Sequence, residues 1–452
     1  MSTLINADAP LDDADAKAEL RKAYRTSEWR ILPLLFGLWM LAWVDRANVA
    51  FAKLQMLPDL GFTETAYGFG AGLFFLGYVV LGVPSAMVQR RVGARLTISV
   101  IALGWGATSV AMMFVKSTTM FYALRFLLGA FEAGFYPGVI LYLNQWYPTQ
   151  RRTRNFSIFH SAAICSTVAV GLTGGFVLDH MSGLLGVAGW RWMFLVQAVP
   201  TMVLAWVAFA TLPDGPATAR WLSERQRGLI LVDLARDAKQ SAAPVSKPAS
   251  LLANPMTWVL AAIYFGILSA NSALSFFVPT ILHEAGFGGY SAIGGVIAAI
   301  CLLGAIGNIA FSTAASRFRD SRLACAIASV ISVSCILVLP AVWHGDRTAT
   351  FVTLALALAG TGAGISLFWQ IPMRYMDKQS ASLGVPLISS VANVAGFVTP
   401  WLIGYVRDLS GTYSSGFMTA AGVQGLAAAI LVVGIPLVLR HHVGEAPRSR
   451  HA

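Results

Sequence analysis

Twelve apolar segments constrain the fold of this chain more than any other feature of its sequence. Each is roughly 18 to 25 residues long, which suits an α-helix crossing about 30 Å of hydrocarbon. The composition agrees, because 56% of the 452 residues are hydrophobic and only 12% are charged. The sequence therefore predicts an all-α integral membrane protein. The predicted spans are residues 30–52, 65–88, 97–115, 118–143, 156–178, 190–212, 256–282, 290–314, 322–343, 349–375, 382–406 and 416–439.

A long polar stretch divides these spans into two sets of six. Its first part mixes apolar and charged residues in the manner of an amphipathic helix at the inner membrane surface, and its second part is rich in Ser, Ala and Pro, which is typical of a linker. The sequence thus predicts two six-helix bundles with a linker and two tails. The predicted domains are a cytoplasmic tail over 1–29, a first bundle over 30–212, a cytoplasmic linker over 213–254, a second bundle over 255–440 and a cytoplasmic tail over 441–452.

The two sets of six show traces of an internal repeat. Arginine motifs beginning at Arg90 and at Arg317 follow the second and eighth spans, and "GFVLD" (175–179) and "GYVRD" (404–408) end the fifth and eleventh. Both pairs are separated by almost the same distance along the chain. This agreement indicates parallel duplication of a six-helix unit.

The net charge of +11 follows from the topology. Most of the 32 Lys and Arg residues fall on the tails, the central linker and alternate loops, and the positive-inside rule then places both termini in the cytoplasm. We therefore expect no nucleic-acid partner. The expected partners are the lipid bilayer and a small molecule, and the chain is expected to be a monomer.

Four charged residues lie inside predicted spans, where charges are costly. Asp45 and Arg46 are neighbours in the first span, and Arg125 and Glu132 lie about two helical turns apart in the fourth. Facing lipid, each would cost about 2.5 to 3.5 kcal/mol, on the order of 10 kcal/mol for the set. They are predicted to line a polar pathway near mid-membrane. The alternative is a structural salt bridge between the first and fourth helices. Lys53 and Asp59, near the outer end of the first span, are expected to be solvated.

These charges suit coupled movement of an anion and a proton. A guanidinium offers a planar fork of donors to a carboxylate ligand, and desolvation favours the protonated form of a buried carboxyl group. An ionised carboxylate would occupy a nearby arginine, and its protonation would release that arginine to the anion. The pattern predicts symport.

Other candidates for the site are polar or aromatic residues in the remaining spans, each of which could equally serve packing or interhelical hydrogen bonding. His160 lies in the fifth span and could titrate near neutral pH. The candidates of the second half are Asn271, Phe368, Trp369, Gln370, Ser389, Ser390 and Asn393.

No arrangement of nucleophile and base, phosphate loop or metal cluster is apparent, so we expect no enzyme, no metal and no cofactor beyond the coupling proton. The cysteines stand singly inside apolar spans, as small packing residues do. They are Cys165, Cys301, Cys325 and Cys335.

At these residues the chain resembles the major facilitator superfamily, and within it the anion:cation symporter branch, which includes bacterial tartrate, galactonate and phthalate permeases and vesicular glutamate transporters. The motifs that carry the resemblance are "WVDRANVAFAKLQM", "GAGLFFLGYVVLGVPS", "VGAR", "RFLLGAFEAGFYPGVILYLNQWYP", "GWRWMFLVQAVP" and "NVAGFVTPWLIGYVRD".

The resemblance implies two bundles that alternate between inward-open and outward-open states. It further implies that Asp45 and Glu132 take part in proton coupling, and that the organic anion is contacted by Arg46, Tyr78, Arg125 and Asn393.

Three departures from the family pattern concern the pocket and the gate. Trp43 stands where the family commonly has tyrosine, which replaces a hydroxyl donor by an indole wall. Arg90 and Ala86 occupy the aspartate and first glycine positions of the usual loop motif. The segment "FWQIPMRYMDKQSASLGVPLISSVANVAGF" also differs from that of other bacterial organic-acid members.

The function expected from these observations is proton-coupled uptake of a small organic carboxylate across a bacterial inner membrane. A tartrate-like hydroxy acid or a sugar acid would use Gln370 and Asn393, whereas an aromatic carboxylate would stack on Trp43 or Trp369. The alternatives are efflux of an organic acid or drug by the same fold, and a membrane receptor that has lost transport.

Overall fold

The computed structural model describes residues 14–240 and 254–437, apart from 316, 319 and 377. Within these residues, 12 helical segments are long and apolar enough to cross a membrane, which confirms the predicted fold class. The first half contains α1 Ala14–Leu60, α2 Glu64–Val92, α3 Ala94–Met112, α4 Thr118–Glu132, α5 Phe135–Trp146, α6 Thr149–His180, η1 Leu184–Gly186, α7 Gly189–Thr211, η2 Pro216–Thr218 and α8 Glu224–Gln240. The second half contains α10 Pro255–Glu284, α11 Tyr290–Ala315, α12 Ser321–Val342, α13 Arg347–Phe368, α14 Pro372–Tyr375, α15 Lys378–Asn393, α16 Ala395–Ser410, α17 Ser414–Ala429 and η3 Ile430–Gly434.

The first helix is much longer than its predicted membrane span. It continues for 47 residues, so the polar residues from Ala14 onward, predicted as part of a tail, are helical. This extension is held by α8, because the Tyr24 hydroxyl donates to Asp233 over 2.7 Å and Arg225 lies 3.0 Å from Glu19. Residues 1–13 and the predicted tail over 441–452 lie outside the described residues.

The polar stretch between the halves forms a helix, α8, as its amphipathic pattern predicts. Ile230 of α8 is buried against the first bundle, and so is Leu222, just before the helix; its neighbour Trp221 stacks on Trp146 with ring centroids 5.5 Å apart. The Ser-, Ala- and Pro-rich part of the predicted linker, over 241–253, lies outside the described residues.

Two membrane spans are interrupted where a proline removes a backbone hydrogen bond. The fourth span breaks after Glu132, and Pro137 follows in the first turn of α5; the tenth breaks after Phe368, and Pro372 opens α14. A proline lacks an N–H and its ring clashes with the carbonyl four residues earlier. In both spans that carbonyl belongs to the break, at Ala133 and at Phe368. The fourth and tenth spans correspond in the internal repeat.

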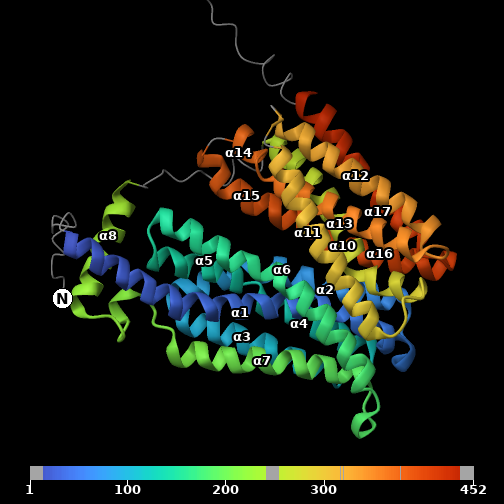
Figure 1. The fold of residues 1–452 in the computed structure, drawn as a ribbon, viewed down its shortest axis with the longest axis horizontal. Helices are drawn as coiled ribbons and strands as arrows, with labels where there is room; N and C mark the ends of the chain where they lie inside the picture. Colours follow the sequence, from blue (N-terminus) through green and yellow to red (C-terminus); the bar gives the residue numbers. More distant parts are fainter. Residues whose placement is uncertain (1–13, 241–253, 316, 319, 377, 438–452) are drawn as a thin grey trace, which may run out of the picture.

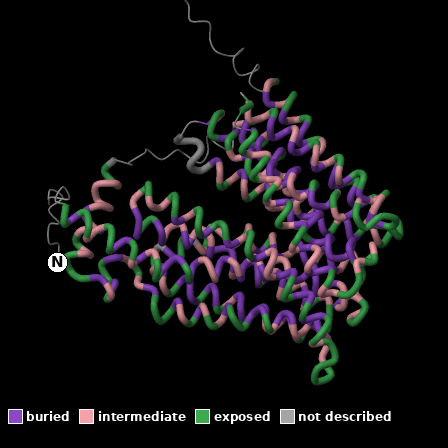
Figure 2. Tube along the Cα trace, in the orientation of Figure 1, coloured by how far each residue is buried: buried purple, intermediate pink, exposed green. Residues whose placement is uncertain are grey.

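The two halves form separate bundles that meet near one end of the molecule (Figure 1). We call this the closed end; it carries the loops at 61–63, 181–188, 285–289, 343–346 and 411–413. Away from the closed end the bundles diverge in the figure. Buried residues run through both bundles and through the region where they meet, as Figure 2 shows.

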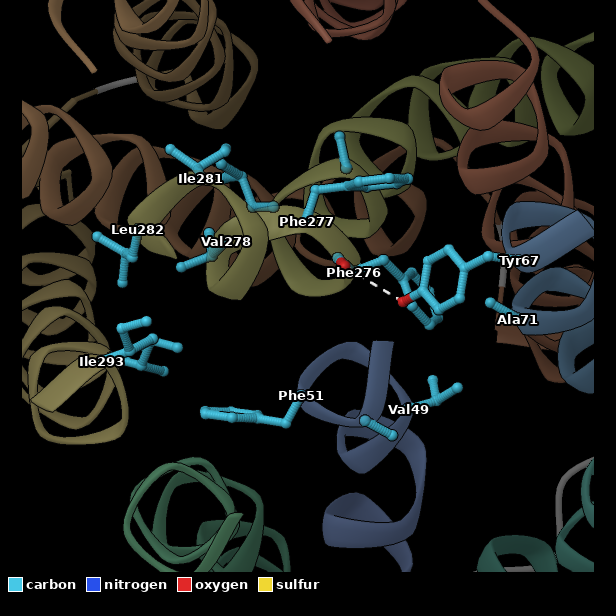
Figure 3. Close-up of a cluster of buried hydrophobic side chains, with 14 of the residues drawn as sticks. Val49, Phe51, Tyr67, Ala71, Phe276, Phe277, Val278, Ile281, Leu282 and Ile293 are labelled. Carbon is cyan, nitrogen blue, oxygen red and sulfur yellow. Dashed lines mark hydrogen bonds between the residues drawn. The ribbon is translucent and has the colours of Figure 1, made fainter. Parts of the chain in front are cut away.

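An apolar cluster joins the halves next to the closed end (Figure 3). Val49 and Phe51 of α1 and Tyr67 of α2 belong to the first half, and Phe276 and Phe277 of α10 belong to the second. A hydrogen bond crosses the boundary here, because the Tyr67 hydroxyl donates to the Phe276 carbonyl over 3.3 Å. The structure therefore shows the halves packed tightly on this side.

Candidate functional site

The four intramembrane charges lie together within the first bundle. Asp45 and Arg46 are on α1, and Arg125 and Glu132 are on α4. The side chains of Asp45, Arg125 and Glu132 are fully buried, whereas that of Arg46 keeps 14% of its surface exposed. Among the four, only Arg46 therefore has appreciable side-chain surface exposed.

Arg46 and Glu132 form an ion pair between the first and fourth spans. The Arg46 Nε donates to Glu132 Oε2 over 2.7 Å. Glu132 is the last residue of α4, directly before the break, and its second oxygen, Oε1, is buried with no hydrogen-bond partner in the described part of the chain. One carboxylate oxygen thus remains free to take a proton or a further donor.

Aromatic rings surround the Arg46 guanidinium. Its Cζ lies 5.0 Å from the ring centroids of both Trp43 and Tyr78, and 5.4 Å and 5.2 Å from those of Trp39 and Phe74. A cation over an aromatic face is attracted by the ring quadrupole, more strongly where water is excluded. The rings therefore stabilise the charge of Arg46 when its carboxylate partner is lost.

Within the described residues, the hydrogen bonds to Asp45 come from neutral donors. Its Oδ1 accepts from the Ser109 hydroxyl over 2.7 Å and from the Asn48 amide over 3.2 Å. Its Oδ2 is buried without a partner among the described residues. Asp45 and Glu132 thus differ in their surroundings, since only Glu132 has a cation in contact.

Arg125 is the least satisfied cation of the group. Its Nη2 donates to the Ala71 carbonyl over 3.2 Å and its Cζ lies 5.3 Å from the Phe74 ring centroid. Its Nε and Nη1 are buried and find no hydrogen-bond acceptor in the described part of the chain. Buried guanidinium donors are nearly always paired, so two unpaired ones indicate a place for an anionic oxygen.

With all four groups ionised, their charges would sum to zero, and this balance would limit what the site can accept. An added carboxylate would leave a net negative charge in a buried place, which is expensive unless a cation accompanies it. A proton on Glu132 would supply that positive charge and would release Arg46. Anion and proton together would then keep the site neutral.

The structure also places the other residues predicted for the site, one in the first half and three in the second. His160 is exposed, and its ring centroid lies 6.4 Å from that of Tyr136 and 6.1 Å from that of Phe156. On the second half, Trp369 packs edge-on against Tyr264 at 4.9 Å, and Gln370 is exposed. The Asn393 amide donates to the Ser389 carbonyl over 2.8 Å, a bond within α15.

Several residues that contact the four charges are not predicted from the sequence. Trp39 and Asn48 are on α1 at helical spacings from Arg46 and Asp45, and Phe74 lies one turn before Tyr78, so a helical-face argument would have found them. Ser109, on α3, carries no such signal, because only the packing of α3 against α1 brings it to Asp45.

The expectation that Lys53 is solvated is wrong. Its side chain is 2% exposed and lies 2.8 Å from the Glu64 carboxylate and 2.9 Å from the Tyr413 hydroxyl. Rings of both halves enclose it, since Nζ lies 5.0 Å from the Tyr67 centroid and 4.6 Å from that of Phe277. Asp59 is 42% exposed in its side chain, in agreement with its prediction.

Known proteins resemble the chain over nearly its whole length. A protein of Pseudomonas putida provisionally named as a metabolite transport protein, NicT, is 36% identical over 96% of this chain and 99% of its own. One of Agrobacterium vitis provisionally named as a tartrate transporter is 36% identical over 89% of this chain and 92% of its own. A quinolone resistance transporter of Acinetobacter baumannii is 31% identical over 90% of this chain and 94% of its own.

The fold and a family model agree with these relatives. A bacterial homologue of the human lysosomal transporter Spinster, solved in an inward-facing and unoccupied conformation, superposes with a TM-score of 0.74 over 92% of this chain and 98% of its own, at 16% identity. The model of the Major Facilitator Superfamily matches residues 34–400. The chain is therefore a multi-pass membrane protein that belongs to the Major Facilitator Superfamily.

Proposed function

We propose that this protein takes up a small organic carboxylate together with protons across a bacterial inner membrane, with both termini in the cytoplasm and no cofactor besides the coupling proton. The carboxylate is a hydroxy acid, a sugar acid or an aromatic acid. The observation that carries the proposal is the pair of unpaired donors on the buried Arg125, beside an Arg46 that is held by Glu132.

Arg125 and Arg46 divide the recognition of the carboxylate. The free Nε and Nη1 of Arg125 offer a fork to its two oxygens. Arg46 reaches the anion only after Glu132 lets it go, and it is the one charge of the four with an exposed surface. Substrate binding and protonation of Glu132 therefore favour the same arrangement, which is the thermodynamic condition for coupling.

Asp45 is proposed as a second proton carrier. Protonation of its Oδ2 would leave both hydrogen bonds to Oδ1 intact, so a proton enters and leaves without breaking the contacts to Ser109 and Asn48. Asp45 would thus exchange protons without rearrangement of α1 and α3, whereas Glu132 exchanges them by releasing Arg46.

Two relatives support different candidate functions. The Agrobacterium vitis relative is named for tartrate, which supports uptake of an organic acid. The Acinetobacter baumannii relative is named for quinolone resistance, which supports the second candidate, efflux of an organic acid or drug. Two buried arginines in the site favour anions over cationic drugs under either candidate.

The test uses purified protein in proteoliposomes with an imposed inward proton gradient, and radiolabelled tartrate and benzoate as separate probes. Because neutral benzoic acid crosses a bilayer and is trapped as its anion on the alkaline side, protein-free liposomes under the same gradient give the background. We expect one probe to accumulate above this background, and a protonophore to abolish the difference. Downhill exchange unaffected by the gradient would contradict coupling. Accumulation driven by an outward gradient would indicate efflux, and binding without flux would indicate a receptor.

A further inference from the structure

The sequence repeat Gly-x-Val-x-Asp reappears in the structure as a matched pair of contacts between the halves. "GFVLD" (175–179) ends α6 of the first half, and "GYVRD" (404–408) ends α16 of the second. Both segments lie at the closed end. Each places its aspartate against the N-terminus of a helix in the opposite half.

Asp408 of the second half caps α2 of the first. Its Oδ1 accepts from the Glu64 backbone N–H over 3.2 Å, and its Oδ2 accepts from the Thr65 backbone N–H over 2.8 Å and from the Thr65 hydroxyl over 2.5 Å. The first N–H groups of a helix lack intrahelical partners and carry partial positive charge, so a carboxylate there is stabilising.

Asp179 of the first half caps α11 of the second in the same way. Its Oδ1 accepts from the Tyr290 backbone N–H over 3.1 Å and its Oδ2 from that of Ser291 over 2.7 Å. The helices α2 and α11 correspond in the internal repeat, as the segments that supply the aspartates do. The two contacts are therefore reciprocal: each half gives one cap and receives one.

The glycine of each repeat allows the approach. A Cβ added at Gly404 would lie 3.1 Å from the Thr65 nitrogen and 2.6 Å from the Glu64 carbonyl carbon. A Cβ at Gly175 would lie 2.9 Å from the Ser291 Cα. Such distances admit no side chain, so only glycine lets the backbones come close enough for an aspartate one turn later to reach the helix end.

Caps that cross between the halves last only while the halves are together. In a transporter whose halves separate at this end, the four N–H groups must exchange carboxylate for water. We propose that Asp179 and Asp408 form a releasable double latch that sets how often the closed end opens, and that they are positioning residues for the transport cycle.

Each aspartate, with the helix N-terminus that it caps and the contacts around them, forms one corner of this latch. The two corners differ in strength. At the Asp408 corner, the residue that is capped, Glu64, also pairs with the buried Lys53, and the Tyr413 hydroxyl bonds both. Lys53 and Glu64 belong to the first half and Tyr413 to the second, so opening that corner must also break the two hydrogen bonds of the Tyr413 hydroxyl to this ion pair. The Asp408 corner is therefore expected to open after the Asp179 corner.

The test measures opening directly and needs no substrate. Val49 is fully buried in the cluster of Figure 3, so a Val49→Cys reporter should react slowly with N-ethylmaleimide in nanodiscs. Labelling of the chain without this added cysteine is measured separately and subtracted as background. Loss of one cap generally shifts a helix equilibrium by roughly 2- to 30-fold. We expect Asp179→Ala and Asp408→Ala each to speed labelling in that range, and the double variant by about the product, since the corners share no partner.

Asp346→Ala is the matched control. Asp346 also caps a helix at the closed end, α13, through the N–H groups of Thr348 and Ala349, but helix and cap belong to the same half. It should leave labelling unchanged while lowering thermal stability. Asparagine keeps one acceptor oxygen and places an NH₂ donor where the second oxygen accepted, so Asp179→Asn combined with Asp408→Asn should label at a rate between those of the parent and the double alanine variant.

Two results would overturn the latch. One is a double alanine variant that stays folded by thermal melting and labels at the parent rate. The other is an Asp346→Ala variant that speeds labelling as much as the double variant, because the caps would then act on general stability only. Neither result bears on the proposed carboxylate transport, which the proteoliposome assay tests separately.

Discussion

At the scale of single residues, the site depends on which charges have partners and which do not. Glu132 holds Arg46 through one oxygen, while Arg125 keeps two buried donors unpaired. A site with every charge satisfied would be a structural clamp between α1 and α4. The unpaired donors are what distinguish a binding site from such a clamp, and two substitutions address them.

Glu132→Gln removes the charge that holds Arg46 and keeps the shape of the side chain. We expect exchange of labelled for unlabelled substrate to persist in proteoliposomes, because Arg46 and Arg125 are both available. Accumulation driven by a proton gradient should be lost; in the parent protein it would reach about tenfold per pH unit for one proton per substrate, since a pH unit is worth about 1.4 kcal/mol. Normal accumulation by the variant would leave Asp45 as the main proton carrier.

Arg125→Ala should weaken substrate binding at least about 30-fold, because removing one partner of a buried charged contact typically costs 2 kcal/mol or more. Arg125→Lys is the matched variant: it keeps the positive charge and loses the planar fork, so part of the affinity should remain. Binding is measured by the thermal shift that tartrate or benzoate produces. Equal binding by the alanine variant and the parent would remove Arg125 from the site.

At the scale of helices, contact between the halves requires small residues on facing surfaces. On α2, a Cβ at Gly72 would lie 2.7 Å from the Phe397 carbonyl oxygen and 2.8 Å from its Cα, whereas a Cβ at Gly82 would meet nothing within 4 Å. Both glycines are inside the same helix, so their helical propensity is equal. They differ in their surroundings, because Gly72 faces the backbone of Phe397 and Gly82 faces open space.

Gly72→Ala should therefore favour separation of α2 from α16, while Gly82→Ala should not. Alanine is better than glycine in a helix by up to about 1 kcal/mol, so the Gly82 variant should be neutral or more stable thermally. Overpacking at Gly72 costs about 1 to 3 kcal/mol and should speed labelling of the Val49→Cys reporter. Equal labelling of both variants would mean that α2 and α16 do not form the contact that closes this end.

The helices differ in how well the sequence predicts their lengths and breaks. The length of the apolar runs predicts the spans, because hydrocarbon thickness alone sets that length. The polar start of α1 carries no comparable signal, since its helix is stabilised by α8 through Tyr24 and Asp233. The break after Glu132 has a signal in Pro137, but the prediction of one continuous span over 118–143 passes over it.

The sequence identifies the charged residues of the candidate site, but it does not show which residues they contact. Intramembrane charge is rare enough to identify Asp45, Arg46, Arg125 and Glu132 from sequence, and their roles remain predictions. Which carboxylate meets which arginine depends on where the folded bundle places α1 relative to α4, and no local pattern contains that information. Lys53 shows the same limit, because the rings that enclose it come from α2, from α10 and from the loop before α17.

At the scale of the whole molecule, the arrangement of charge predicts orientation. The closed end carries the loops with few cations, and the opposite end carries Arg151, Arg152, Arg154 and the arginines of α8. Basic loops stay on the cytoplasmic side. We therefore expect the closed end to face outward, in which case the structure corresponds to a state whose outer side is shut.

Orientation is tested with one exposed serine from each end, Ser182 in the loop after α6 and Ser223 before α8. In a chain with Cys165→Ser, a membrane-impermeant maleimide should label Ser182→Cys on intact cells, and Ser223→Cys only after permeabilisation. Serine and cysteine are similar in size, so both variants should fold. The reverse pattern would place the closed end in the cytoplasm. The latch of Asp179 and Asp408 would then govern release of substrate into the cell instead of its entry from outside.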